Sequence, residues 1–128
     1  MLPPGTNFPQ VKLPSSKGGV TDLGEALLKA PAVVGIVPVR DEAWLSAVAD
    51  YAYGWLMERF LNVYLVVDSP PSESRLLAET FGLQIPLLSD NQGLLLPAQA
   101  GFYLVSPPGV IQKGFGLEAG LQALDRLV

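Results

Sequence analysis

The stretch VYLVVDSPPSESRLLAETFGLQIPLLSDNQG, residues 63–93, decides how this chain folds. Residues 63–67 form a short run of mainly β-branched and apolar residues, which is typical of a strand buried on both faces. Residues 68–71 then open a helix, because proline is tolerated in a first turn where its missing N–H has no partner. The buried face predicted for this helix consists of Leu76, Leu77, Thr80 and Phe81. Gly82 suits the left-handed position after the helix, and residues 86–89 predict a short strand before a turn.

The chain before this stretch predicts a second buried strand and a long helix. Residues 32–37 are continuously apolar and bounded by prolines, which favours a strand covered on both faces. From residue 42 to residue 61, apolar side chains recur at spacings of three and four and form one stripe. The members of this stripe are Trp44, Ala47, Val48, Tyr51, Ala52, Trp55, Leu56 and Phe60. Tyr53 falls off the stripe and is expected to be exposed, while Gly54 costs the helix about 1 kcal/mol relative to alanine.

The remaining elements complete the predicted fold class. They are short strands at 11–13, 20–21 and 94–96, a helix from Asp22 to Lys29, hairpin strands at 101–105 and 110–115, and a helix at 117–128. Strands that alternate with helices imply parallel pairing in the centre, and the hairpin adds antiparallel strands. We therefore expect a single α/β domain over residues 1–128, with a mixed central sheet flanked by helices on both faces.

The composition excludes several classes of function. The chain has no cysteine and no histidine, so it offers no thiolate nucleophile, no disulfide and no imidazole for a general base or a zinc ligand. A formal net charge of −4 without a basic cluster argues against nucleic-acid binding. The sequence shows neither a signal peptide nor an apolar run of the ~18 residues that a membrane span needs. We expect a cytoplasmic protein without a membrane partner.

Residues 66–74, VVDSPPSES, and residues 81–93, FGLQIPLLSDNQG, resemble segments of the peroxiredoxin family, also called the alkyl hydroperoxide reductase and thiol-specific antioxidant family. Residues 5–13 are similar to the opening segment of that family, and residues 102–111 are similar to its late hairpin. The resemblance covers almost the whole chain. It implies a thioredoxin-like fold of the peroxiredoxin type.

The residues that carry the chemistry of that family are replaced in this chain. The family motif places a threonine four positions and a cysteine seven positions after a proline, and an arginine before the late hairpin. Pro38 matches the proline, but Glu42 stands at the threonine position, Leu45 at the cysteine position and Ala100 near the arginine position. Ala100 also stands near the place of the cis-proline of thioredoxin-like proteins, so we expect that feature to be absent. The resemblance therefore implies a vestigial active-site region at Pro38, Glu42, Leu45 and Ala100.

A candidate surface for a ligand or partner lies beside this region. Its members are Arg40, Asp41, Trp44 and Asp68. Asp41, Glu42, Asp68 and Asp90 are predicted to follow strands at one edge of the sheet, where ligands bind in open α/β folds. Carboxylates there suit Mg²⁺ or Ca²⁺, but each also stands where a helix cap or turn residue is expected, and capping is the preferred interpretation. Arg40 either attracts an anion to the helix start or pairs with a neighbouring acid.

These observations favour one function hypothesis and leave two alternatives open. The leading hypothesis is a non-catalytic domain that binds an unknown protein partner or a small apolar ligand through the former active-site face. One alternative is a carboxylate- or metal-dependent enzyme on the same scaffold, and the other is a purely structural homodimer. No cofactor is predicted. The prolines, the short loops and the missing cysteine and histidine are compatible with heat stability.

Overall fold

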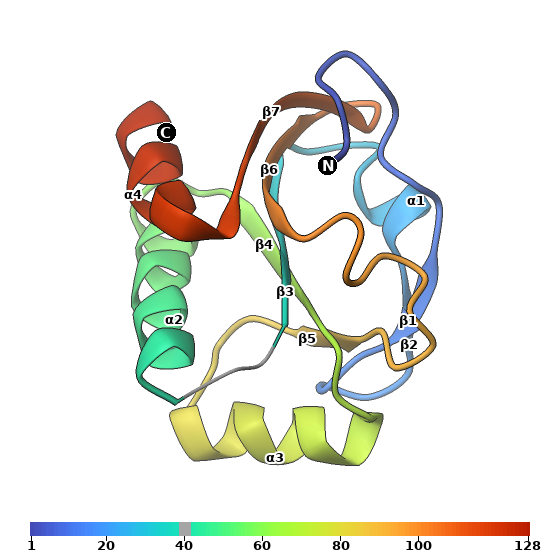
Figure 1. Ribbon diagram of the computed structural model, residues 1–128, viewed down its shortest axis with the longest axis vertical. Helices are drawn as coiled ribbons and strands as arrows, with labels where there is room; N and C mark the ends of the chain where they lie inside the picture. Colours follow the sequence, from blue (N-terminus) through green and yellow to red (C-terminus); the bar gives the residue numbers. More distant parts are fainter. Residues whose placement is uncertain (39–41) are drawn as a thin grey trace.

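The structure is a computed structural model that describes residues 1–38 and 42–128, with only the backbone described at 42–44 and 118–119. Figure 1 shows its elements along the chain. In order they are β1 (Lys12–Pro14), β2 (Val20–Asp22), α1 (Leu23–Ala26), β3 (Ala32–Val37), α2 (Glu42–Met57), β4 (Asn62–Val67), α3 (Pro71–Phe81), β5 (Leu87–Ser89), β6 (Gly101–Ser106), β7 (Val110–Phe115) and α4 (Leu117–Leu127).

The centre of the fold is a five-stranded mixed sheet in the order β5-β4-β3-β6-β7. Strands β3, β4 and β5 pair in parallel, and β6 and β7 add antiparallel pairing. All six residues of β3 are buried, as its unbroken apolar sequence predicts for a central strand. Strands β1 and β2 form a separate hairpin. The mixed sheet predicted from the sequence is therefore confirmed.

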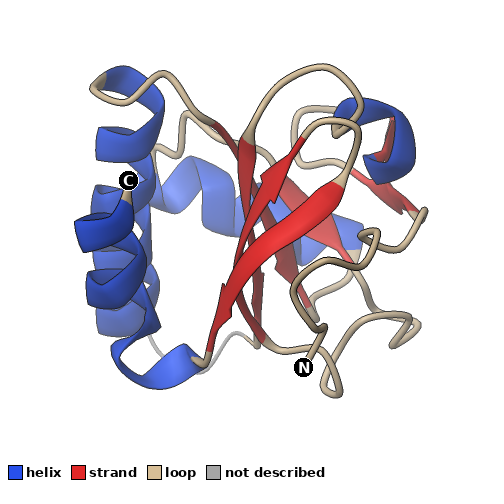
Figure 2. Cartoon of the chain, turned by 90° about the horizontal axis from the view of Figure 1, so that it is seen from above, coloured by secondary structure: helices blue, strands red, loops and turns tan. Residues whose placement is uncertain are grey.

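The two faces of the sheet carry two apolar cores, because side chains alternate along each strand. Val34 and Ile36 of β3 join a core under the N-terminal arm, α1 and the loop before β6, which we call the arm-side core. Val33 and Val37 join a core under α2 and α4, which we call the helix-side core. Figure 2 shows α2 and α4 on one side of the sheet and α1 on the other. Helices thus flank both faces, as expected.

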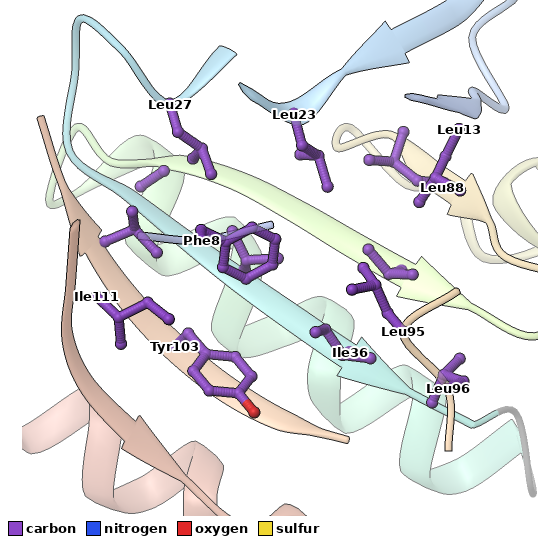
Figure 3. Close-up of a cluster of buried hydrophobic side chains, with 14 residues drawn as sticks. Phe8, Leu13, Leu23, Leu27, Ile36, Leu88, Leu95, Leu96, Tyr103 and Ile111 are labelled. Carbon is purple, nitrogen blue, oxygen red and sulfur yellow. The ribbon is translucent and has the colours of Figure 1, made fainter. Parts of the chain in front are cut away.

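The N-terminal arm closes the arm-side core and extends the sheet past β7. Ile111 of β7 accepts a hydrogen bond from the Gly5 backbone at 2.8 Å and donates one to Thr6 at 2.9 Å. Phe8 is buried, and its ring meets Tyr103 edge-to-face with 6.1 Å between the ring centroids. Figure 3 shows both rings among the aliphatic side chains of this core. The arm therefore shields one end of the β7 edge from further pairing.

Helix α2 is shorter than the apolar stripe predicts. It ends at Met57 rather than Leu61, because Phe60 has a left-handed backbone with φ of 57° and the Leu61 N–H turns back to the Trp55 carbonyl. Phe60 is consequently 86% exposed, and Ala47 is exposed as well, so their assignment to the stripe was wrong. Val48, Ala52 and Trp55 are buried, and Tyr53 is exposed as predicted.

The buried face of α3 also differs from the prediction. Leu76 and Thr80 are exposed, whereas Ser74 is fully buried. The helix meets β5 through the Ser74 hydroxyl, which lies 2.7 Å from the Ser89 hydroxyl. This contact turns Leu77 and Ala78 toward the helix-side core and Leu76 toward solvent. The predicted end of the helix is confirmed, because Gly82 adopts the left-handed conformation with φ of 61°.

Two further expectations need correction. Residues 94–96 form no strand in the described structure, since their backbone nitrogens bond to the Asp90 side chain instead of to a neighbouring strand. Helix α1 spans four residues rather than extending to Lys29, although Asp22 caps it as predicted by accepting from the Glu25 N–H at 3.2 Å. Within the described residues, no helix is both long and apolar enough to cross a membrane.

Candidate functional site

The strand register brings several predicted residues to one edge of the sheet. Val37 of β3 pairs with Val67 of β4, so Pro38 and Asp68, the next residues, leave the sheet side by side. Ile36 pairs with Gly101 of β6, which places Ala100 beside the same end of β3. Asp90 follows β5 at this edge, and its backbone N–H donates to the Val67 carbonyl at 2.7 Å. We call this region the candidate edge, defined by Pro38, Asp68, Asp90 and Ala100.

The described residues of the vestigial region carry apolar side chains. Pro38 and Ala100 are half-buried, and Ala100 packs on the arm-side core. Leu45, at the position assigned to the cysteine, is only 1% exposed in the first turns of α2. Glu42 begins that helix. The side chains of Glu42 and Trp44, and residues Arg40 and Asp41 altogether, lie outside the described residues.

Asp90 has a structural role that the sequence only partly indicates. Its side chain is 2% exposed and accepts hydrogen bonds from the backbone N–H groups of Leu94 at 2.8 Å, Leu95 at 2.8 Å and Leu96 at 2.9 Å. Both carboxylate oxygens are therefore occupied by the loop that follows. For Asp90 the turn-forming interpretation agrees with the structure. Asp68, by contrast, is exposed.

The loop before β6 carries polar groups that no sequence pattern predicted. The Tyr103 hydroxyl donates to the Gln99 carbonyl at 2.8 Å and accepts from the Leu2 N–H at 3.1 Å. Burial raises the pKa of Tyr103 above its ordinary value, and the hydrogen bond from Leu2 offsets part of that increase. Among the described residues, no donor reaches the buried Oε1 atom of Gln99. No residue pattern signals this arrangement, because most of its partners are backbone atoms.

A proline in this loop corrects another expectation. The Leu96–Pro97 peptide is cis, so a cis-proline does precede the hairpin, although not at the position of Ala100. Pro107–Pro108, in the hairpin turn, is also cis.

The candidate edge carries the carboxylates of Asp68 and Asp90 and the apolar side chains of Pro38 and Ala100. In the part of the chain that the structure describes, no three His, Cys, Asp or Glu side chains are grouped so as to hold a metal ion. The whole sequence contains neither cysteine nor histidine. The described edge can therefore accept hydrogen bonds and pack against apolar surface, but it offers no thiolate for attack on a peroxide.

Comparison with known proteins identifies the fold. No protein-family model matches the sequence, and no curated protein matches it. A mutant PrxQ of Xylella fastidiosa has a TM-score of 0.82 at 13% identity, covering 99% of this chain and 95% of that one. Peroxiredoxin Q of Xanthomonas campestris has a TM-score of 0.75 at 14% identity, covering 91% and 88%. Peroxidoxin BcpB of Mycobacterium tuberculosis has a TM-score of 0.75 at 18% identity, covering 98% and 97%.

Each of these similarities covers most of this chain and most of the compared chain. At such low identity they establish architecture rather than activity. The chain has the thioredoxin-like fold of the peroxiredoxins, and it has that fold without a cysteine.

Proposed function

We propose that this protein is a non-catalytic peroxiredoxin-like domain that binds a protein partner or an apolar ligand at the candidate edge. The main observation behind this proposal is that a buried leucine occupies the position of the family's cysteine. Leu45 stands there and is 1% exposed, so the position contributes to packing rather than to chemistry. A chain without cysteine cannot reduce peroxides through a thiolate or a sulfenic acid.

The position of the candidate edge supports binding. In open α/β folds, ligands bind beyond the carboxyl ends of parallel strands, and Pro38 and Asp68 follow two such strands. Pro38 and Ala100 present apolar atoms that are still partly accessible. A partner with an exposed apolar group would pack against these atoms.

Site-specific photo-crosslinking tests this proposal. A photoreactive residue replaces Ala98, which is exposed in the loop next to Ala100. A matched variant carries the same group at Gln112, an exposed position of β7. We expect a discrete adduct from a lysate of the source organism at position 98 and none of that mass at position 112.

The adduct is then tested against the edge itself. Ala100→Arg places a long cation at the candidate edge and is expected to abolish the adduct at position 98, and circular dichroism checks that this variant, whose position is half-buried, retains the fold. If the adduct forms equally at positions 98 and 112, or survives Ala100→Arg, the proposal for this edge is wrong. A cytoplasmic location, a homodimer and heat stability stay predictions from the sequence.

A further inference from the structure

A second hollow lies apart from the candidate edge, between the β1–β2 turn, α3 and the loop after α3. It has a volume of about 320 Å³, and its lining includes Ser16, Lys17, Arg75, Glu79 and Gln84. This volume is at the lower end of the range of roughly 300–1,000 Å³ that is typical of ligand pockets. We call it the turn pocket. None of its lining residues belongs to the candidate edge.

The Ser16 hydroxyl is held in a fixed position in this pocket. The Ser16 backbone N–H donates to the Leu87 carbonyl at 2.9 Å, and the Leu87 N–H donates to the Ser16 hydroxyl oxygen at 3.0 Å. A serine hydroxyl also carries one proton to donate. Among the described residues no acceptor takes that proton. Ser16 thus offers the pocket an O–H donor that β5 holds in place.

Two cations line the same pocket. Lys17 is anchored at its backbone, where its N–H donates to the Ser15 hydroxyl at 3.2 Å. Arg75 lies on α3, and in the described structure the only ion pair within 4.0 Å joins Arg59 to Asp125, so neither Lys17 nor Arg75 is neutralised in this way. Glu79 is the one acid in the lining. The pocket therefore combines a net positive charge with a fixed hydroxyl donor, although the chain as a whole has a net charge of −4.

We propose that the turn pocket binds the phosphate or carboxylate group of a small anionic ligand. Guanidinium, ammonium and hydroxyl donors form the strong charge-assisted hydrogen bonds that such oxygens accept. The amide side chain of Gln84 supplies a further donor on the wall formed by the loop after α3. This binding is independent of the function proposed for the candidate edge.

Titration of the ¹⁵N-labelled protein by NMR tests the proposal, with sodium phosphate in one arm and sodium acetate in the other at constant ionic strength. We expect saturable shifts of the Ser16, Lys17 and Gln84 amides in at least one arm. Saturation by phosphate alone assigns a phosphate ligand, and saturation by acetate alone assigns a carboxylate. Lys17→Gln and Arg75→Gln are each expected to weaken binding and so to raise the dissociation constant about tenfold. Both side chains are exposed, so these variants fold.

Lys113→Gln is the matched control, because Lys113 is an exposed cation on β7 outside the pocket. It should leave the dissociation constant unchanged. The proposal is overturned if neither anion saturates the shifts up to about 100 mM, or if Arg75→Gln and Lys113→Gln have the same effect. Equal effects would show general attraction to surface charge rather than a site.

Discussion

The carboxylate of Asp90 lies 2.8 Å from the backbone nitrogen of Leu95, and this hydrogen bond ties the end of β5 to a loop of buried leucines. The same side chain also accepts from Leu94 and Leu96. Three donors converge on a charged group that is almost fully buried. Asp90→Ala leaves these donors unpaired and is expected to lower the free energy of unfolding by about 3 kcal/mol.

Urea denaturation measures this change. Asn91→Ala alters the exposed neighbour of Asp90 and should stay within about 0.5 kcal/mol of the parent. A loss below about 1 kcal/mol for Asp90→Ala would show that the leucines hold the loop without the carboxylate.

The link between α2 and α4 gives a second prediction. The fully buried Trp55 donates its indole N–H to Asp125 at 3.0 Å. Asp125→Ala leaves that N–H unpaired and should lower the free energy of unfolding, measured by urea denaturation, by about 1–2 kcal/mol. Asp125→Asn retains an acceptor and should cost less than half as much. The Arg59–Asp125 ion pair spans 3.8 Å between side chains that are 37% and 39% exposed, so solvent screening leaves it about 0.5 kcal/mol or less.

The Arg59→Gln variant removes this ion pair but keeps the indole hydrogen bond, so its free energy of unfolding measures the contribution of the ion pair alone. The Arg59 side chain also donates to the carbonyls of Asp125 and Val128, and glutamine keeps one amide donor for these acceptors. If Asp125→Asn proved as costly as Asp125→Ala, the negative charge rather than the hydrogen bond would hold the two helices together.

The phenols of the buried Tyr103 and the partly buried Tyr64 predict a loss of stability in alkali. Burial raises the pKa of Tyr64 and of Tyr103 above the ordinary value of 10.0. The folded state therefore favours the neutral phenols, and their contribution is fully present below pH 10 and lost as pH rises through the folded-state pKa values. The urea midpoint should fall between pH 8 and pH 11, and it should fall less in Tyr64→Phe than in the parent protein. An equal decrease in both proteins would contradict this assignment.

Two glycines are predicted to respond to alanine in opposite directions. Gly101 follows Ala100 with φ of 151°, and an added Cβ would lie 2.6 Å from the Phe115 carbonyl oxygen. Gly101→Ala should therefore destabilise the protein by about 2 kcal/mol or more. In α2, a Cβ on Gly54 would meet no atom closer than 3.9 Å, so Gly54→Ala should stabilise it by about 0.5–1 kcal/mol. Thermal denaturation compares the two, and a lower midpoint for Gly54→Ala would contradict the prediction for α2.

The sequence predicted the parts of the fold that depend on periodicity. β3 was predicted from an unbroken apolar run and is buried along its whole length. Gly82 was predicted at a left-handed position and adopts it. Asp68 and Asp90 were predicted to follow strands at one edge of the sheet, and the strand register and the Asp90–Val67 backbone hydrogen bond confirm this for both.

The errors occur where one contact outside the pattern decides the outcome. Leu76 was predicted to be buried because its side chain is apolar. However, α3 contacts the sheet through the hydroxyl groups of Ser74 and Ser89, and a hydropathy pattern does not predict such a contact. Residues 94–96 looked like a strand because their side chains are apolar, yet their N–H groups bond to Asp90. Backbone groups are the same in every residue, so no sequence pattern reports which acceptor they reach.

The chain has the fold of the peroxiredoxins but no cysteine, and a peroxide-consumption assay tests most directly whether it lacks thiol chemistry. Purified protein, a dithiol donor with its thioredoxin, and hydrogen peroxide or an alkyl hydroperoxide are followed by the loss of peroxide. We expect the rate to equal that of the same mixture without the protein, because no residue of the chain can form a sulfenic acid. A rate that rises in proportion to protein concentration and saturates with peroxide would contradict the account.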